Sequence, residues 1–415
     1  MRIVMVGVGT RGDAEPMAVF AAELAGRGHD VTVGLASDLV WIGQALGLRT
    51  VDLRVSAREF LQSERGRRWL AAGDFQSYVH WMLEYKRQIA DQLHEDLIAL
   101  AADADVLISG TATELELVVI AEAAGIPYHS VHHAPLRSNI AFPHLLVSTD
   151  IFSPEQNLET YALMDEANWP IFEPFVNDLR TKVGLVPTTE NISTRLARSG
   201  SLELQAYSRH VVPELAEWDS RRPLTGFLAP TADQRVLLDN PVEPELDQWL
   251  DAGEPPVYFG FGSMPVLDPD AALTMIERVA GVLGVRALVS MQSGTAEDSA
   301  VRVVSNVAHE EVLPRCRAAV HHGGAGTSAT SLRAGLPTVV CSVFADQPFW
   351  GAQLQRMGVG STLRFTDLSE PTLLAALEPA LADGSRQRAA ELAELLSEEN
   401  AAAQAADALE TALAG

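Results

Sequence analysis

The sequence predicts an α/β protein made of two Rossmann-like domains that face a central cleft. Three observations support this prediction. Short runs rich in Val and Ile end in glycine and lead into helical spacing, which is the order of parallel α/β units. The pattern stops in a proline-rich stretch near 210–256 and then starts again. The chain has 415 residues, 47% of them hydrophobic, and can therefore form two cores.

The first half opens with a strand–helix–strand unit. Residues 2–8 form a buried strand that ends in a glycine turn, Glu15 to Arg27 show helical spacing, and 29–35 form the next strand. Such a unit implies a parallel sheet with a right-handed crossover. A second unit follows with a strand at 105–109, a helix at 114–124 and a strand at 126–131.

Two stretches of this half depart from the alternating pattern. Residues 56–100 carry many aromatic side chains, which we expect on helices. They form either ordinary core or one wall of an apolar pocket. Residues 139–200 contain several prolines and are predicted to be rich in loops that supply another wall.

The second half restarts the pattern and ends in a helical segment. The predicted strands are 256–263, 286–291, 318–321 and 337–342, and the predicted helices are 271–283 and 326–334. Residues 385–414 are rich in Ala, Glu and Leu and are strongly helical. We place the link between the two halves in the proline-rich stretch.

Composition excludes several classes of function. The formal net charge of −25 disfavours binding to nucleic acid and to anionic membranes. Two cysteines, Cys316 and Cys341, do not make a disulfide framework. No apolar run is long enough for a transmembrane helix, and the N-terminus does not read as a signal peptide. We therefore expect a soluble cytoplasmic protein without stable membrane insertion.

The most informative stretch is His321-His322-Gly323-Gly324-Ala325-Gly326-Thr327, which follows a predicted strand and opens a predicted helix. Glycine lets backbone N–H groups approach an anion closely, and a helix N-terminus carries about half a positive charge. His321 and Thr327 add side-chain donors. The stretch predicts a phosphate-binding turn, although glycine-rich turns also occur where a helix merely packs close to its strand.

Asp346 and Gln347 lie side by side after the strand predicted at 337–342. Together they offer two acceptors and an amide, which suit the vicinal hydroxyls of a sugar. An Asp-Gln pair in a loop is usually solvated surface. Its position favours a binding role, because loops at the carboxyl ends of strands line the ligand crevice in open α/β sheets.

These motifs resemble the donor-binding signature of family 1 glycosyltransferases, in particular bacterial enzymes that glycosylate antibiotics and the sterol glucosyltransferases. The opening turn and the first strand of the second half resemble the same groups. The matching segments are the glycine-rich stretch, Arg333-Ala-Gly-Leu-Pro337, Asp346-Gln347-Pro348-Phe-Trp350-Gly, Gly358-Val-Gly360, Gly9-Thr-Arg-Gly12-Asp13-Ala-Glu15-Pro16 and Tyr258-Phe-Gly-Phe-Gly262-Ser263-Met264.

The resemblance implies a GT-B fold with an acceptor domain at 1–220, a donor domain at 221–395 and a C-terminal helix at 396–415 that packs back on the first domain. The diphosphate would be held by the glycine-rich turn and Ser263, the donor sugar by Asp346 and Gln347, and the base by backbone near Val307. The implied donor-binding residues are Arg11, Gly12, Ser263, Val307, His321, Gly323, Gly324, Ala325, Gly326, Thr327, Asp346 and Gln347.

Asp13 is implied as the general base of an inverting reaction that needs neither metal nor cofactor. His133, after the strand at 126–131, is a second candidate base. Both have structural alternatives, since an Asp before a helix is often an N-cap and a His at a strand end is often structural. Trp81 and Phe142 are the candidates for contact with the acceptor.

Two positions depart from plant members of the family. The acid that holds the ribose in those proteins is replaced by Ala329, and the Trp that stacks on the base falls in a stretch that reads Asn306-Val307-Ala308-His309. Uridine and thymidine donors therefore both stay open, as do the sugar, the modified acceptor atom and the oligomeric state.

The expected function is transfer of a sugar from a dTDP or UDP donor to a hydroxyl of an apolar natural product. Two alternatives accompany it. One is a sugar-nucleotide epimerase on the same fold, which would bind the donor without an acceptor. The other is a catalytically silent helper protein that keeps the nucleotide-sugar site.

Overall fold

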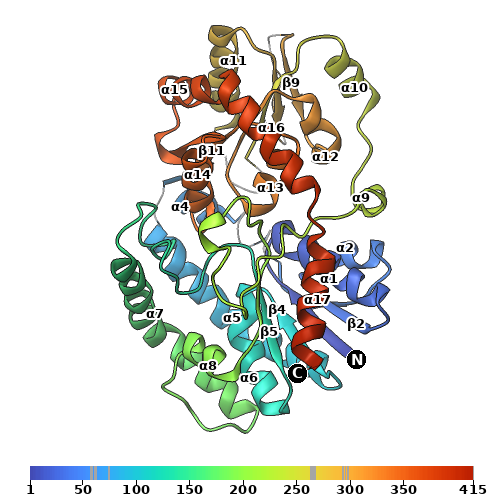
Figure 1. Cartoon of the computed structure of the whole chain (residues 1–415), viewed down its shortest axis with the longest axis vertical. Coiled ribbons are helices and arrows are strands. Elements are labelled where there is room, and N and C mark those ends of the chain that lie inside the picture. The colour runs from blue at the N-terminus through green and yellow to red at the C-terminus, as the bar shows by residue number, and fades with distance from the viewer. Residues whose placement is uncertain are drawn as a thin grey trace. The chain divides into compact units, whose positions relative to one another are not determined.

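The computed structural model describes residues 1–56, 59, 63–72, 75–261, 268–291, 294, 296 and 299–414, with the side chains of all of these except 67, 70–72, 75, 76 and 78. The chain divides into two compact units (Figure 1). The first consists of Met1–Arg58, Leu83–Leu238 and Asn400–Gly415, and the second of Glu59–Met82 and Asp239–Glu399.

The first unit contains a parallel sheet of six strands in the order β3-β2-β1-β4-β5-β6. This is the Rossmann strand order, in which the direction of winding reverses between β1 and β4. Ile3 of β1 pairs with Val31 of β2 on one side and with Val106 of β4 on the other. The strands are β1 (Arg2–Gly7), β2 (Asp30–Leu35), β3 (Arg49–Asp52), β4 (Val106–Ser109), β5 (Tyr128–His132) and β6 (Glu203–Gln205).

Helices connect these strands and enclose one continuous apolar core. Met5 of β1, Phe20 of α1 and Leu107 of β4 are completely buried in it. The helices are α1 (Arg11–Gly26), α2 (Val40–Ala45), α5 (Phe75–Ala101), η1 (Thr111–Thr113), α6 (Glu114–Ala124), α7 (Pro154–Lys182), α8 (Ile192–Ser199), η2 (Pro213–Leu215), α9 (Ala232–Leu238) and α17 (Ala401–Ala414). Helix α5 begins in residues of the second unit and continues into the first.

Helix α7 corrects the prediction of a loop-rich stretch at 139–200. Ser153 and Gln156 form a capping box, and Pro154 occupies the first turn, where its missing N–H costs nothing. Pro170 and Pro174 lie four residues apart, so both fall on one face of the helix, and both are exposed. The backbone carbonyls that lose a partner at these prolines can therefore bond to water.

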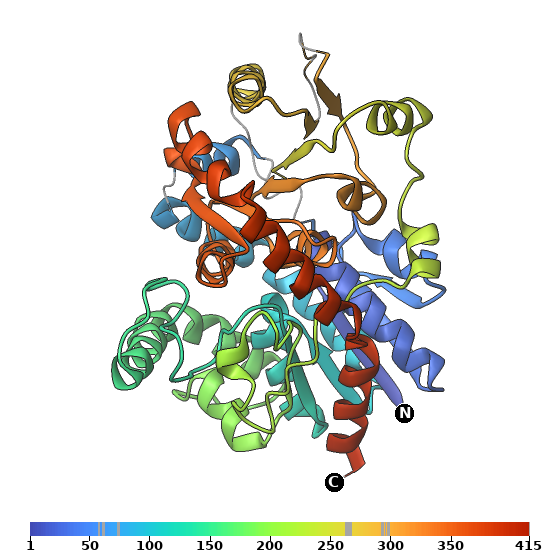
Figure 2. The ribbon, with the colours of Figure 1, turned by 45° about the horizontal axis from the view of Figure 1, so that its top comes forward.

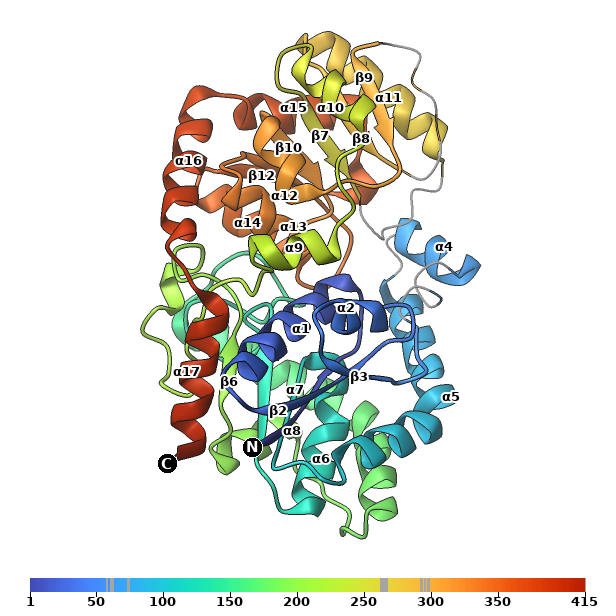
Figure 3. The same ribbon diagram turned by 90° about the vertical axis from the view of Figure 1, so that its right-hand side faces the viewer.

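The second unit repeats the same topology (Figure 3). Its six parallel strands are ordered β12-β11-β10-β7-β8-β9, and the winding reverses between β7 and β10. Phe259 of β7 and Val320 of β10 are buried at its centre. The strands are β7 (Val257–Gly260), β8 (Ala287–Ser290), β9 (Val301–Val304), β10 (Ala318–His321), β11 (Thr338–Ser342) and β12 (Gly360–Arg364).

Both faces of this sheet have their own apolar cluster. The helices of the unit are α4 (Glu64–Ala72), α10 (Pro244–Asp251), α11 (Pro269–Leu283), α12 (His309–Val312), η3 (Leu313–Arg315), α13 (Ala325–Arg333), α14 (Gln347–Arg356), η4 (Phe365–Asp367), α15 (Glu370–Ala380) and α16 (Asp383–Ser397). The two sheets confirm the prediction of two Rossmann-like domains.

The helical C-terminal segment is two helices rather than one, because it is interrupted at 398–400. The second of them, α17, packs along α1 within the first unit (Figures 1 and 2). Arg27, just after α1, donates to Asp407 at 2.6 Å, to Glu410 at 2.9 Å and to the carbonyl of Ala403 at 3.1 Å. His29 lies 3.0 Å from Glu410. A charged cluster thus joins residues about 380 positions apart in the chain.

Candidate functional site

The turn after β10 carries the glycine-rich stretch. It lies at the carboxyl end of the strand beside β7, where the winding of the second sheet reverses and ligands bind in this class of fold. Helix α13 begins at Ala325, and its N-cap residue, Gly324, makes no side-chain capping bond. The first N–H groups of α13 are thus left without a side-chain cap, which makes this helix end suitable for an anion.

Gly323 is required by the geometry of this turn. Its φ of +89° lies in the region that residues with a side chain rarely adopt. A Cβ atom at this position would lie 2.4 Å from Cγ1 of Val340 and 3.3 Å from the backbone oxygen of Gln347. The turn after β10 is therefore packed directly against the turn after β11, so the predicted phosphate and sugar motifs lie side by side.

His321 is fully buried at the end of β10, and its protonation state follows from its contacts. Nδ1 accepts a hydrogen bond from the N–H of Gly323 at 3.0 Å. Burial, and then the neighbouring His322 and His309, lower the pKa of His321 well below 6.5. The ring is therefore neutral with its proton on Nε2, and this buried N–H has no partner among the described residues. It can donate to an anionic oxygen of a ligand.

Asp346 and Gln347 form the turn after β11. The carboxylate of Asp346 accepts a hydrogen bond at Oδ2 from the indole N–H of Trp350 at 2.8 Å. Gln347 is buried, and its Oε1 accepts from the backbone N–H groups of Val343 at 2.8 Å and Phe344 at 3.3 Å. The amide oxygen of Gln347 is thus engaged within the turn. Asp346 thus contributes a carboxylate and Gln347 an amide to the turn that follows β11.

Of the other residues predicted for the donor site, the structure describes Val307 and Thr327 but not Ser263. Val307 lies in the loop between β9 and α12, next to His309, which hydrogen-bonds to the hydroxyl of Tyr258 at 2.8 Å. Thr327 is half-buried in the first turn of α13, and Ala329 is buried. Ser263 lies outside the described residues.

Asp13 lies in the first turn of α1, at the carboxyl end of β1 where the first sheet reverses its winding. Thr10, not Asp13, is the N-cap, and Asp13 is the third residue of the helix. Oδ2 of Asp13 accepts from the backbone N–H of Thr10 at 2.7 Å and from its hydroxyl at 3.1 Å. Burial raises the pKa of this half-buried carboxyl, although the bonds from Thr10 act in the opposite direction.

Gly9 makes room for this carboxylate. Its φ is +143°, and a Cβ at position 9 would lie 2.2 Å from Oδ2 of Asp13. Gly12 donates its N–H to the hydroxyl of Thr10 at 3.3 Å, so it belongs to the helix cap. Arg11 is exposed, donates to Glu15 at 2.7 Å and lies 5.7 Å from the ring of Trp41.

His133 follows β5, the second strand along from β1 in the sheet. Its Nε2 is buried without a partner among the described residues, and burial together with the adjacent His132 lowers the pKa of His133 to about 4. The ring is therefore neutral at physiological pH and can accept a proton. His132 itself is completely buried and hydrogen-bonds to Glu114 at 3.2 Å.

A buried network of charges supports the loop after β5. Arg137 donates to Glu114 at 2.6 Å and also to Glu203, which Arg222 reaches at 3.0 Å. Burial alone raises the pKa of both carboxyls, but Arg137 and His132, joined at Glu203 by Arg222, together outweigh that effect and hold both pKa values below their ordinary 4.5. The network gives the loop that carries His133 a rigid base. Its charges come from distant segments, and no local pattern in the sequence indicates it.

The two candidates for contact with the acceptor lie in different units. Trp81 packs edge-to-face on Trp69, with 5.7 Å between the ring centroids. Phe142 belongs to the loop after β5 and is only 2% exposed, and its backbone N–H donates to Asn139 at 2.8 Å. In the structure described, Phe142 is thus a core residue of that loop.

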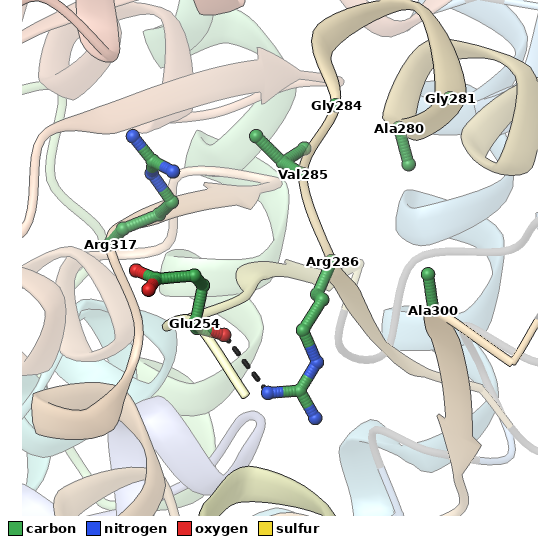
Figure 4. A pocket seen from close by; sticks show the side chains of 8 residues that line it. All are labelled: Glu254, Ala280, Gly281, Gly284, Val285, Arg286, Ala300 and Arg317. Atoms are coloured by element: carbon green, nitrogen blue, oxygen red, sulfur yellow. Dashed lines mark hydrogen bonds between the residues drawn. The ribbon is translucent and has the colours of Figure 1, made fainter. Parts of the chain in front are cut away.

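A hollow of about 300 Å³ lies at the amino ends of the strands of the second sheet (Figure 4). Its lining residues precede strands rather than follow them: Glu254 comes before β7, Arg286 before β8, Ala300 before β9 and Arg317 before β10. Arg286 there donates to the carbonyl of Glu254 at 2.9 Å and stacks on Trp249. The hollow is separate from the turns after β10 and β11, which lie at the carboxyl ends of their strands.

No group of three or more His, Cys, Asp or Glu side chains among the described residues is arranged to hold a metal ion. None of the helices in the described part of the chain is both long and apolar enough to cross a membrane.

Comparison with known proteins agrees with this geometry. Residues 288–411 match the family model of the erythromycin biosynthesis protein CIII-like C-terminal domain. An uncharacterized glycosyltransferase of Mycobacterium leprae is 34% identical over 414 residues, which cover 98% of this chain and 95% of that protein. A sterol 3-beta-glucosyltransferase of Arabidopsis thaliana is 30% identical over 431 residues, covering 98% of this chain and 65% of that protein.

Solved structures show the same fold along the whole chain. The glycosyltransferase of kitacinnamycin has a TM-score of 0.72 at 20% identity and covers 99% of this chain and 98% of its own. The calicheamicin glycosyltransferase CalG4 has a TM-score of 0.68 at 16% identity, covering 100% and 98%. The glycosyltransferase VinC has a TM-score of 0.64 at 18% identity and covers 100% of both chains. The chain therefore belongs to the family 1 glycosyltransferases, nucleotide-sugar-dependent enzymes with the GT-B fold.

Proposed function

We propose that this glycosyltransferase moves a sugar from dTDP or UDP to a hydroxyl group of an apolar natural product. The reaction inverts the anomeric configuration, needs no metal ion, and uses Asp13 as its general base. The observation that carries the donor half of the proposal is the buried Nε2–H of His321, which has no partner among the described residues and lies just before the uncapped start of α13.

The turn after β10 can stabilise the leaving nucleoside diphosphate. As the glycosidic bond to the diphosphate breaks, negative charge grows on the phosphate oxygens. A neutral imidazole N–H and the N-terminus of α13 are fixed donors that meet this charge without moving. The positive end of the helix dipole adds a favourable field. These groups supply the stabilisation for which a metal ion serves in other transferases.

The choice between thymidine and uridine donors draws support from relatives. VinC was solved in complex with dTDP, and the Streptomyces glycosyltransferase SsfS6 with thymidine diphosphate. Both cover almost the whole chain. We therefore favour a dTDP sugar and keep UDP as the alternative.

The acceptor half rests on Asp13. Attack of a hydroxyl on the anomeric carbon requires loss of its proton as the new bond forms, and a carboxylate within reach can take it. The turn holds Oδ2 of Asp13 through Thr10, which fixes the carboxylate, and the raised pKa makes it a stronger base than an exposed aspartate. His133 is the second candidate, because its neutral ring also has a buried nitrogen that can accept a proton.

An apolar acceptor agrees with the surface of the first unit. Exposed large apolar side chains concentrate between residues 140 and 171, in the loop after β5 and on α7. Ile140 is 61% exposed and Leu163 is 59% exposed. Exposed apolar side chains that gather into one patch often mark binding sites. An antibiotic-like aglycone fits this surface, and a sterol, the acceptor named for the Arabidopsis relative, is the alternative.

Calorimetric titration with UDP, dTDP, ADP and GDP, each with and without Mg²⁺, tests the donor site. We expect dTDP or UDP to bind at least tenfold more tightly than the purine nucleotides, with equal affinity in the presence of EDTA. Failure of all four to bind would overturn the proposed donor site.

The Asp346→Ala variant separates sugar binding from nucleotide binding. We expect it to weaken the nucleotide sugar far more than the free nucleoside diphosphate, because Asp346 is proposed to contact only the sugar. Equal losses for both ligands would rule out a contact between Asp346 and the sugar.

Slow hydrolysis of the nucleotide sugar without acceptor would distinguish an enzyme from a silent helper protein, which binds the nucleotide sugar without turnover.

A further inference from the structure

The turn that carries Asp346 has an unusual backbone. Ala345, the residue just before it, has a φ of +57°. In that region the Cβ of an L-residue crowds the backbone, and glycine or asparagine is the usual occupant. Strained backbone of this kind persists only where the surroundings hold it in place, and it is concentrated at functional sites. The strain at Ala345 therefore points to a turn whose shape is imposed by its neighbours.

The side chain of Gln347 is one of the groups that impose this shape. Its Oε1 accepts from the N–H groups of Val343 and Phe344 at 2.8 and 3.3 Å, which closes the turn on itself. Gln347 is only 4% exposed, so these bonds are shielded from water. The two residues before Ala345 are thus tied to the residue after Asp346.

Trp350 is the second group. Asp346 occupies the N-cap of α14, where an Asp side chain normally accepts from the backbone of the first helical turn. It makes no such bond here. Its Oδ2 instead accepts from the indole N–H of Trp350, one turn along the helix, at 2.8 Å. Trp350 is 1% exposed and packs edge-to-face on Phe349, so its ring cannot move freely.

We propose that Trp350 is a positioning residue for donor-sugar recognition. Its N–H draws the carboxylate of Asp346 away from the helix cap and sets the plane in which it meets the hydroxyls of the sugar. The strained turn at Ala345 and the bonds of Gln347 hold the backbone beneath it. The enzyme then distinguishes sugars that differ at one hydroxyl, because a carboxylate in a fixed plane satisfies only one arrangement of hydroxyls. This inference rests on the proposed sugar-binding role of Asp346.

The proposal predicts a change in selectivity that packing alone does not produce. A buried Trp side chain stabilises the fold wherever it lies. If Trp350 served packing alone, its loss would destabilise the protein without changing the preference for one sugar over another. Loss of the N–H removes the bond that draws the carboxylate of Asp346 away from the cap of α14. Hydrogen bonds to charged groups correspond to about a tenfold or larger effect on binding. The preference for one sugar over its epimer is therefore expected to fall about tenfold, while binding of the free nucleoside diphosphate is unchanged.

The main experiment compares Trp350→Phe with the wild type. Dissociation constants are measured for dTDP, dTDP-glucose and its 4-epimer dTDP-galactose, or for the UDP series if the wild type selects uridine. Trp249→Phe is the matched control, since this indole also donates a hydrogen bond in the second unit, to the carbonyl of Ser299 at 3.3 Å. We expect the control to keep the wild-type ratio between the two sugars and Trp350→Phe to lose most of it.

Ala345→Gly provides a second test that does not depend on removing a core side chain. Glycine adopts the positive φ without strain, so the variant is expected to fold at least as stably as the wild type. It should nevertheless discriminate less between the two sugars, because the turn is then free to relax. Loss of selectivity without loss of stability is a result that a purely structural role does not give.

The outcomes are distinguishable from failure of the proposed function. If the wild type binds dTDP or UDP and prefers one sugar, but Trp350→Phe and Ala345→Gly keep that preference, Trp350 serves packing only and the inference is wrong. A wild type that binds the nucleotide but both sugars equally overturns it as well. Absence of any nucleotide binding overturns the donor site itself, and the inference with it.

Discussion

The Asp13→Asn variant tests the general base most directly. Asn has nearly the same shape as Asp and keeps a carbonyl oxygen, so it can still accept the N–H of Thr10 that now lies 2.7 Å from Oδ2. It cannot take a proton from the acceptor hydroxyl. The substitution therefore removes the proposed chemistry and leaves most of the local structure in place.

Loss of the general base and loss of the capping contact should differ in magnitude. General-base catalysis contributes about 10²- to 10⁴-fold to turnover, which corresponds to about 2.7–5.5 kcal/mol in activation free energy. The loss of a helix-capping contact costs about 1 kcal/mol, which lowers the melting temperature by about 2–4 °C in a domain of this size. We expect a loss of turnover of at least about a hundredfold, with only a small change in stability.

Three measurements check this expectation: the rate of nucleoside diphosphate release in the presence of donor and acceptor, the dissociation constant for dTDP, and the melting temperature. The dissociation constant should stay within about twofold of the wild type, less than the loss of one hydrogen bond would cause. Thr10→Ala is the matched control, because it removes the capping side chain and its hydroxyl, 3.1 Å from Oδ2, while the carboxylate stays. It should lose about 1 kcal/mol of stability and less than tenfold in turnover.

The pH profile adds a second readout. Burial raises the pKa of Asp13 above its ordinary 3.8, so the base is lost to protonation as the pH falls through that raised value. The acid limb of kcat/KM in the wild type should therefore lie above pH 3.8 and be absent from the Asn variant. Turnover of Asp13→Asn within about fivefold of the wild type, or an equal loss in Thr10→Ala, would falsify the assignment and direct attention to His133.

Three further predictions follow from the same structure. His321→Ala should weaken dTDP binding about tenfold to a hundredfold in a calorimetric titration, because a hydrogen bond to a charged oxygen is lost; unchanged affinity would exclude contact with the diphosphate. Arg137→Met should lower the free energy of unfolding by about 3–5 kcal/mol at pH 8, since Glu114 then loses its guanidinium partner and Glu203 keeps only Arg222. In the wild type the lowered pKa values of Glu114 and Glu203 stabilise the fold above pH 4.5, and that effect is lost as the pH falls; in the variant we expect burial to raise the pKa of Glu114. Urea denaturation should therefore show the penalty shrinking between pH 8 and pH 5, and a constant penalty would contradict the argument. Arg27→Ala should speed amide hydrogen exchange in residues 401–414 severalfold, because three contacts that hold α17 on α1 are removed, with no change in exchange expected for β1.

The turn after β11 was predicted only in part from its motif. The position of Asp346 and Gln347 after a buried strand predicted a ligand-binding turn, and the structure packs that turn against the glycine-rich stretch. The sequence did not reveal that the amide oxygen of Gln347 is used within the turn, or that Trp350 holds the carboxylate. The four-residue spacing between Asp346 and Trp350 is a usable signal, because residues four apart meet on one face of a helix.

The secondary structure was likewise predicted only in part. The strands near the middle of each sheet were predicted because both of their faces are buried, which produces continuous apolar runs ending in glycine. The four edge strands, β3, β6, β9 and β12, were not predicted. They have three to five residues each, and three of them are partly exposed, so the apolar run is too short or too mixed to recognise. Helix α7 was not predicted. Its two interior prolines argue against a helix, and its few buried apolar residues leave no clear 3.6-residue period.

The sequence by itself thus determined the two Rossmann-like halves, the glycine-rich turn with its paired histidines and the likeness to family 1 glycosyltransferases. These depend on local patterns, since a buried strand, a tight turn and a helix start are each encoded within about ten residues. The resemblance implied that the C-terminal helix packs on the first domain, but only the tertiary structure decided that α17 is held along α1 through Arg27, that Arg137 joins two buried carboxylates, and that Gly9 leaves space for Asp13. The first two join segments far apart in the chain, and the third depends on where a side chain turns. Contacts of this kind arise from the folded arrangement and have no periodicity that a single sequence can show.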